Sequence, residues 1–259
     1  MISSTDPHRN RKPRNIADAE WATRVQLAAA YRLAAHFGLT DLIYTHISAR
    51  VPGEPGRFLL NPHGWFFDEI TASSLVKIDV DGSPVGDQRF EVNAAGFTIH
   101  SALHQSRHDV DCVVHLHTDA GMAVAALECG LLPLNQISMQ FHDRVAYHDY
   151  EGISLELDER ERIVASMGSE NHMILRNHGL LTVGRSVAEA FTRMFYLNRA
   201  CEIQVKTLSM GQKVVLPSPE VCEHAAQQHD DYANLDTVHL DREWTALLRL
   251  IERGSPYNC

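Results

Sequence analysis

The segment from Val110 to His117, VDCVVHLH, limits the possible folds of this chain more than any other. It reads as a strand that is apolar nearly throughout, which is typical of a central position in a sheet. Helical patterns occur before and after it, at Asp18–Phe37, at Asn93–Ser106 and from the capping box Ser186-Val-Ala-Glu189 to Gly211. Apolar residues make up 44% of the 259 residues, enough to fill one core. An α/β domain is predicted.

A second strand, Ile43 to Val51, alternates strictly between two faces. Its polar face carries His46, Ser48 and Arg50 and is suited to line a pocket. Further strands are expected at Arg57–Asn61, Val76–Val80, Val145–Tyr147, His172–Arg176 and Leu180–Val183. Short helices are expected at residues 71–75, from the cap Asp119 to Gly130, from the cap Asp158 to Gly168, and at Trp244–Glu252.

Charge and cysteine usage exclude several classes of protein. The net charge of −10 and a pI of 5.9 argue against nucleic acid as a partner, since no basic run is present. Five cysteines without a C-x-x-C motif indicate a reducing compartment, not a disulfide framework. No long apolar run and no apolar centre in the first fifteen residues occur, so no membrane partner is expected. We expect a cytoplasmic protein.

The chain divides into three parts by composition. Residues 1–15 are polar and are expected to form a flexible arm. Residues 16–212 contain the periodic segments of the main domain. Residues 213–259 are expected to form an extension that packs on this domain or on a neighbouring subunit.

Histidines supply the strongest functional signal. His115 and His117 are two apart on the predicted central strand, so both imidazoles project from the same face and can close on one ion. Among 16 histidines such a pair can also arise by chance, as hydrogen-bonded sheet residues. His178 in the turn Asn177-His178-Gly179 adds a third imidazole in a loop of the kind that presents ligands. Together the three predict a divalent metal site.

Other histidines are weaker candidates. His100 and His104 are four apart on a helix and could chelate, but we expect them to pack or to face solvent. His108 and His148 lie in polar surroundings, where exposure to solvent is expected.

Four motifs, VVHLHT, LRNHGLLTVG, YTHISARV and FLLNPHGWFFDEITASSLVKIDVDG, resemble the class II aldolase/adducin family, and the likeness covers Asp18 to Gly211. The resemblance implies a three-layer α/β/α fold with a mostly antiparallel central sheet. It also implies that His115, His117 and His178 bind zinc, with Fe²⁺ or Mn²⁺ as alternatives. Family members are commonly tetramers with pockets at subunit boundaries, which implies a homotetramer here.

The sequences of the segments ITASSLVKIDVDG, VAYHDYEG and ILRNHGLLTVG resemble the adducin-like branch more than the sugar-phosphate aldolases. The aldolases have Ser-Ser-Glu where this chain has Ala94-Ala95-Gly96, so it lacks two phosphate-binding hydroxyls and the proton-transfer carboxylate. Their Gly-Asn-x-Ser-x-Arg strand corresponds here to Thr45-His46-Ile47-Ser48-Ala49-Arg50. A sugar-phosphate aldolase is therefore disfavoured.

The polar residues near this strand are the substrate-binding candidates. Arg50 could anchor a carboxylate through a bidentate fork, although an internal ion pair explains it equally well. His46 and Ser48 share its face, which could also be a solvated strand face. Asn61 and His63, in the NPHG turn, resemble the loop that flanks the family's anion pocket, while an Asn that stabilises the turn is the simpler interpretation.

His142 is the candidate to replace the missing acid-base group, because imidazole titrates near neutrality. The alternative, a loop histidine paired with Asp143, is favoured somewhat more. Tyr147 and Tyr150 are expected to be structural.

The function expected is that of a metal-dependent lyase-type enzyme for aldol cleavage, decarboxylation, dehydration or epimerisation. Its substrate would be a small carbonyl or hydroxy-acid compound, anionic and not a sugar phosphate. Two alternatives stay open: a non-enzymatic oligomerisation module like the adducin head, and a three-histidine iron oxygenase. Metal analysis separates the first two, and oxygen uptake identifies the third.

Overall fold

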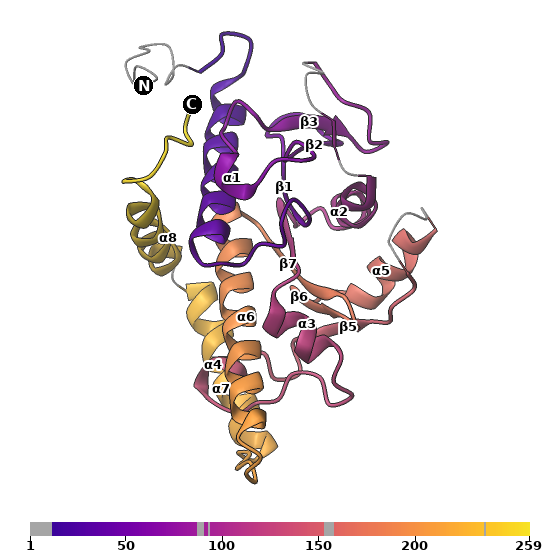
Figure 1. The fold of residues 1–259 in the computed structure, drawn as a ribbon, viewed down its shortest axis with the longest axis vertical. Coiled ribbons are helices and arrows are strands. Elements are labelled where there is room, and N and C mark those ends of the chain that lie inside the picture. The colour runs from indigo at the N-terminus through magenta and orange to yellow at the C-terminus, as the bar shows by residue number, and fades with distance from the viewer. Residues whose placement is uncertain (1–11, 87–90, 93, 153–157, 236) are drawn as a thin grey trace.

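The computed structural model describes residues 12–86, 91–92, 94–152, 158–235 and 237–259, without the side chains of 94–97, 232–235 and 237–238. Within these residues, one sheet has the strand order β3 (Val76–Asp79), β2 (Arg57–Leu60), β1 (His46–Arg50), β4 (Cys112–Leu116), β7 (Gly179–Gly184), β6 (His172–Leu175) and β5 (Ala146–His148) (Figure 1). Neighbouring strands are antiparallel except β5 and β6, which are parallel. The mostly antiparallel sheet implied by the family resemblance is confirmed.

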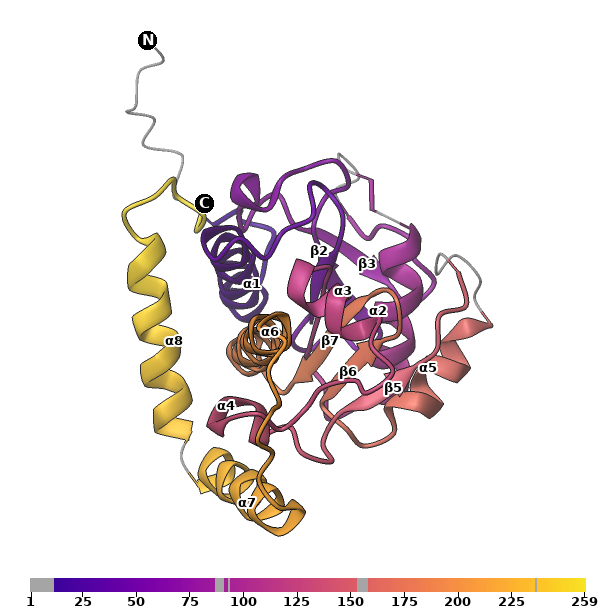
Figure 2. The same ribbon diagram turned by 60° about the horizontal axis from the view of Figure 1, so that its bottom comes forward.

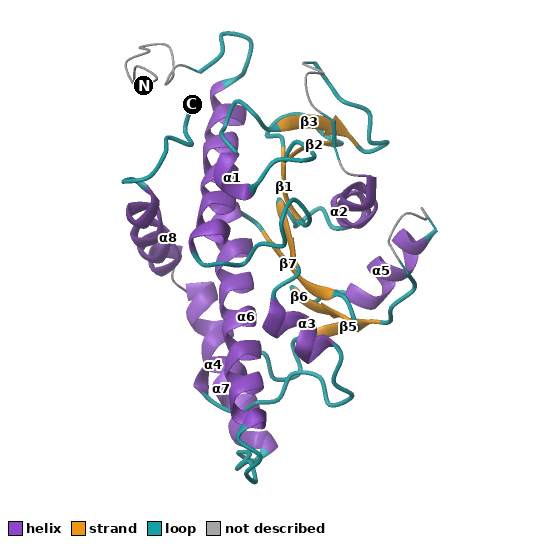
Figure 3. Cartoon of the chain, viewed as in Figure 1, coloured by secondary structure: helices purple, strands orange, loops and turns teal. Residues whose placement is uncertain are grey.

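Helices cover both faces of this sheet (Figure 2 and Figure 3). One face packs against α1 (Asp18–His36), α3 (Asp119–Ala125) and α6 (Val187–Ser209), and the other against α2 (Ala94–Ser106) and α5 (Glu159–Met167). The three-layer arrangement is therefore the one expected.

β4 is buried on both faces, as its apolar sequence predicted. Val114 and Leu116 belong to the core cluster shared with α1 and α6, whereas Val113 belongs to the cluster that includes Ile99 and Leu103 of α2. Each such side chain contributes about 1.5–3 kcal/mol when it is fully buried. This burial on both sides fixes β4, and with it His115, at the centre of the sheet.

β1 begins at His46, later than the alternation from Ile43 predicted. Leu42 and Thr45 have positive φ angles of 47° and 69°, and a left-handed residue interrupts extended backbone. The amide of Tyr44 donates to the carbonyl oxygen of Asp41 at 2.8 Å and closes a tight turn. The chain therefore enters β1 through a turn whose first residue is Asp41.

Three local predictions were wrong or incomplete. Residues 71–75 form a turn and not a helix, because the Ser74 hydroxyl accepts from the amide of Thr71 while the Ser74 amide donates to the Thr71 carbonyl. The cap of α3 is Thr118, whose hydroxyl accepts from the Gly121 amide, and the helix ends at Ala125, earlier than expected. Asp158 precedes α5 but makes no capping hydrogen bond with its side chain.

The last part of the chain contains two helices, α7 (Pro219–Leu235) and α8 (Thr237–Ile251), of which only part of α8 was expected. Arg144 holds α7 by donating to both carboxylate oxygens of Glu223 at 2.8 and 2.9 Å and to Asp230 at 2.7 Å. On α8, Trp244 lies against Phe191 of α6 and donates to the side chain of Gln26.

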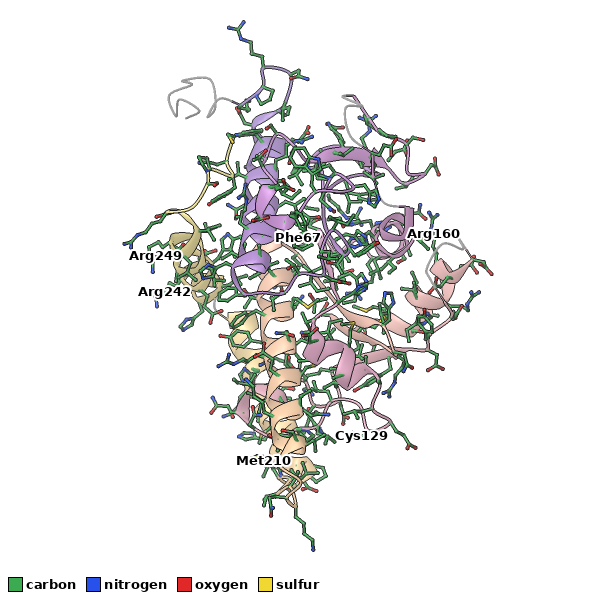
Figure 4. All side chains as sticks on the ribbon, in the orientation of Figure 1. Phe67, Cys129, Arg160, Met210, Arg242 and Arg249 are labelled. Carbon is green, nitrogen blue, oxygen red and sulfur yellow. The ribbon has the colours of Figure 1, made fainter. Side chains whose placement is uncertain are left out.

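The opposite face of α8 is polar, and Figure 4 shows Arg242 and Arg249 pointing away from the body of the molecule. Beyond α8, the carbonyl oxygen of Tyr257 accepts from the amide of Ala72 at 2.7 Å. Residues 213–259 contact the main domain at several points, and the three-part division stays a prediction, with residues 1–11 outside the described part. None of the described helices combines the length and the apolar character needed to span a membrane.

Candidate metal centre

Two of the three histidines come from the end of β4. His115 and His117 alternate with Leu116, so their rings lie on the same face, and the Nε2 atoms of the two are 3.1 Å apart. Thr118 ends the strand immediately afterwards by capping α3. The sequence thus places both imidazoles at a strand end, where His115 is buried and His117 is partly exposed.

The third histidine, His178, lies in the turn between β6 and β7. Asn177 adopts a positive φ of 55°, and the His178 amide donates to the Leu175 carbonyl at 3.1 Å. Gly179 allows the turn to approach β4, because a Cβ there would lie 2.7 Å from the Leu116 carbonyl oxygen and 3.0 Å from Cδ2 of His117. The ligand atoms of the three histidines all lie within 4.8 Å of one another.

Outer hydrogen bonds assign the protons of two rings. Nδ1 of His115 donates to the Leu180 carbonyl oxygen at 3.0 Å, and Nδ1 of His117 donates to Oδ2 of Asp41 at 3.0 Å. Each neutral ring then carries its lone pair on Nε2. Two lone pairs that face each other at 3.1 Å repel, whereas a cation bound by both removes the repulsion, so the residues present fit a metal ion.

The charge state of the cluster also suits a metal. Burial, with smaller contributions from His178 and His117, lowers the pKa of His115 well below its ordinary value. Burial, followed by His117 and His148, lowers the pKa of His178 to about 4. Both rings are therefore neutral at physiological pH, as metal ligation requires.

His46 lies beside the cluster. It is paired with His115 across β1 and β4, and the two rings stack with centroids 6.1 Å apart. Burial, followed by the charges of His100 and other histidines, lowers the pKa of His46 well below its ordinary value. The structure thus brings one of the substrate-binding candidates, His46, to the histidine cluster, whereas His63 is exposed and its amide donates to the Glu91 carbonyl oxygen at 2.7 Å.

Ser48 does not line an open pocket. Its hydroxyl lies between Nδ1 of His100 at 2.6 Å and Nε2 of His104 at 2.8 Å, and all three side chains are buried between β1 and α2. His100 and His104 therefore pack in the interior. The His100 ring also meets His46 edge-on, with centroids 5.6 Å apart.

Arg50 and Asn61 have partners inside the fold. Arg50, at the end of β1 away from His46, donates to the carbonyl oxygens of Val110 at 2.6 Å, Arg107 at 3.0 Å and His104. It borders a separate cavity of about 710 Å³ between α1, α6 and α8. Asn61 is buried and accepts from the Tyr31 hydroxyl at 2.9 Å. The structure does not bring Arg50 to the cluster. Its guanidinium instead stabilises the segment between α2 and β4.

His142 is also remote from the cluster within one chain. His142 precedes β5, which runs parallel to β6, so it lies near the first residue of β6, His172, which contacts the carbonyl oxygen of Arg144. His178 follows the last residue of β6 and therefore lies at the opposite end of the same strand. Nε2 of His142 lies 3.6 Å from Oδ2 of Asp143, which is the alternative favoured from the sequence.

Three residues near the site were misjudged or missed. His148 was expected to be exposed, but it is buried, with Nδ1 2.9 Å from the hydroxyl of Ser166. Tyr150 was considered structural, yet it is 53% exposed and its ring centroid lies 6.2 Å from that of His178. Asp41 gave no signal in the sequence, since only the positive-φ turn brings it to His117. His108 is exposed as expected, and the side chains at Ala94–Gly96, which open α2, lie outside the described residues.

Comparison with known proteins decides the family. The family model described as the class II aldolase and adducin N-terminal domain matches residues 25–205. The chain belongs to this family. A protein of Caulobacter vibrioides that is provisionally named an aldolase class 2 protein is 49% identical over 241 residues, 93% of each chain.

Two further relatives extend the comparison. The crystal structure of an aldolase II superfamily protein from Pseudomonas syringae superimposes with a TM-score of 0.89 at 50% identity, over 94% of this chain and 98% of that one. Alpha-adducin of Mus musculus is 50% identical over 189 residues, which are 72% of this chain but only 26% of the adducin. The adducin-like character of the motifs is confirmed.

Proposed function

We propose that this protein is a divalent-metal enzyme of the lyase type that acts on a small carbonyl or hydroxy-acid compound. The observation that carries the proposal is the convergence of three imidazoles, from His115, His117 and His178, whose ligand atoms lie within 4.8 Å of one another. Three protein ligands are the usual number in a catalytic zinc site, since they leave a position for substrate. Zinc is the metal we propose, and the relatives named as aldolases support this class of chemistry.

When bound, such a metal supplies Lewis-acid polarisation of a carbonyl oxygen and stabilises the negative charge that develops there. The residues of the chain hold and shape the site. The Leu180 carbonyl and Asp41 orient two of the rings. The rings of His46 and Tyr150 lie next to His115 and His178, and we propose that they contact the substrate.

The residues at the start of α2 argue against a sugar phosphate as the substrate. Ala94-Ala95-Gly96 has neither hydroxyls for a phosphate nor a carboxylate for proton transfer. A general acid-base group contributes about 10²–10⁴-fold to the rate, so losing it brings an ordinary aldolase close to background. We expect negligible cleavage of fuculose 1-phosphate even when the metal is bound, and robust cleavage would contradict this interpretation.

Metal content is the direct test of the proposed function. The protein, purified without a His tag, should contain about one metal ion per chain, and His117→Ala should lose it. His108→Ala is the matched control, because His108 is exposed and outside the cluster. Equal metal content in wild type and His117→Ala would refute the metal site and favour the adducin-like oligomerisation module, whereas iron with oxygen uptake would favour an oxygenase.

A homotetramer is part of the proposal. From its position before β5, His142 can serve as an acid-base group only at the site of another chain. His142→Ala should then abolish turnover while the metal stays bound, and sedimentation of the wild type should show an oligomer. A monomer that retains activity would contradict this role of His142.

A further inference from the structure

The two outer hydrogen bonds of the cluster differ in kind. The partner of His115 is the backbone carbonyl of Leu180 within β7, which is fixed by the sheet. The partner of His117 is the carboxylate of Asp41, whose side chain is 40% exposed and lies on the turn before β1. In the described part of the chain, His117 is the one polar side-chain partner of Asp41. The carboxylate is therefore available for a task at the cluster.

Asp41 determines which nitrogen of His117 carries the proton. The carboxylate accepts from Nδ1–H, so Nε2 is left bare and faces the bare Nε2 of His115 at 3.1 Å. Without the carboxylate, His117 could place its proton on Nε2 and donate it to His115 across the same 3.1 Å. That hydrogen bond would satisfy both rings, and it would block the lone pair of His117 that a metal needs.

We propose that Asp41 is a positioning residue that holds His117 in the metal-binding tautomer, strengthening metal binding while destabilising the metal-free cluster. The inference rests on the proposed function in that a metal is the ligand. Partners in this position, which orient a ligating imidazole and increase its basicity, typically change metal affinity by about 10- to 100-fold.

A purely structural Asp41 would behave differently. If its role were to stabilise the turn from Asp41 to Tyr44, removing the carboxylate would lower the melting temperature of the metal-free and the metal-bound protein alike. The positioning role predicts opposite changes: the metal-free protein melts at the same or a higher temperature, and the metal-bound protein melts at a lower one.

The experiment compares wild type with Asp41→Ala and Asp41→Asn at about pH 8, where an ordinary imidazole is neutral. Zinc affinity is measured by competition with a chelator, and the melting temperature is measured with zinc and with excess chelator. The tautomer of His117 in the metal-free protein is read from imidazole ¹⁵N shifts. Asp119→Asn is the matched control: it removes an exposed carboxylate two residues from His117 that makes no contact with the cluster among the described residues.

For Asp41→Ala we expect zinc binding about 10- to 100-fold weaker. We also expect an unchanged or higher melting temperature without metal, and a shift of His117 to the Nε2–H tautomer. Asp41→Asn, which keeps an acceptor oxygen, should retain the tautomer and lose less affinity, and Asp119→Asn should match wild type. The proposal is overturned if Asp41→Ala binds zinc as tightly as wild type, or if its metal-free form melts lower with the tautomer unchanged. A wild type that binds no metal refutes the proposed function instead, and the tautomer still tests the role of Asp41.

Discussion

Replacing Ser48 by alanine tests the buried contact between β1 and α2. The Ser48 hydroxyl bridges Nδ1 of His100 and Nε2 of His104, and the other ring nitrogens of both histidines have no hydrogen-bond partner among the described residues. A methyl group in place of the hydroxyl could not serve either ring. Because both rings are fully enclosed, water cannot replace the hydroxyl without opening the interface.

The expected loss of stability follows from these contacts. Leaving a buried polar atom unsatisfied costs about 1–3 kcal/mol, so two orphaned nitrogens amount to about 2–6 kcal/mol. This is a large share of the roughly 5–15 kcal/mol that stabilises a typical domain. Urea unfolding of the metal-free protein, followed by circular dichroism, should show a lower midpoint with an unchanged slope.

Ser106→Ala is the matched control for this measurement. Ser106 lies on the exposed side of the same helix and donates only to the carbonyl of Ala102 at 2.8 Å. Its removal should change stability by no more than about 0.5 kcal/mol. If Ser48→Ala unfolds at the same urea concentration as Ser106→Ala, the bridging hydroxyl does not stabilise the interface and the reasoning is wrong.

Two further predictions concern backbone approach and pH. Gly179→Ala places a methyl group 2.7 Å from the Leu116 carbonyl oxygen, so the turn must move away from β4; metal titration should show weaker binding, and unchanged affinity would contradict the argument. Burial lowers the pKa of His100 and of His104 to about 3, while an unfolded imidazole titrates near 6.5, so the unfolded chain binds more protons between these values. Stability should be complete above about pH 6.5 and fall by about 1.4 kcal/mol per histidine at pH 5.5; equal urea midpoints at pH 8 and pH 5.5 would rule this out.

The elements of the fold could be predicted from the sequence wherever a local pattern is compatible with a single secondary structure. The two-sided apolar run of β4 was predicted correctly, and so was the Ser186 cap of α6. The second half of the predicted capping box differs, because the Glu189 carboxylate accepts from the amide of Arg185 at 2.7 Å. The direction of the strands was not predicted by local pattern, because alternating strands and helices usually indicate a parallel sheet, and only the family motifs implied otherwise. The missed helix α7 contains a polar His/Gln/Asp-rich stretch, and its attachment through Arg144 is a contact between distant segments.

The candidate site divides in the same way. His115 and His117 were identified from strand alternation, which is local, and His178 from its place in a tight turn. Arg50 was assigned to the site because it shares a strand face with His46, and His142 because it lies in a segment expected near the metal. Neither property indicates at which end of the sheet the side chain lies. Asp41 could not have been predicted from the sequence. Its approach to His117 depends on positive φ angles at Leu42 and Thr45, and neither residue type is one that favours this conformation.

The docking of α8 on α1 sets an order for folding during synthesis. Trp244 and Gln26, which join these helices, are 218 residues apart in the sequence. At about 5–20 residues per second, Gln26 emerges from the ribosome roughly 10–40 seconds before its partner. In the last part of that interval, after β4 and the turn that carries His178 have been synthesised, the outer surface of α1 still lacks the cover of α8. The three histidines can therefore come together on a nascent chain whose first helix is still partly bare.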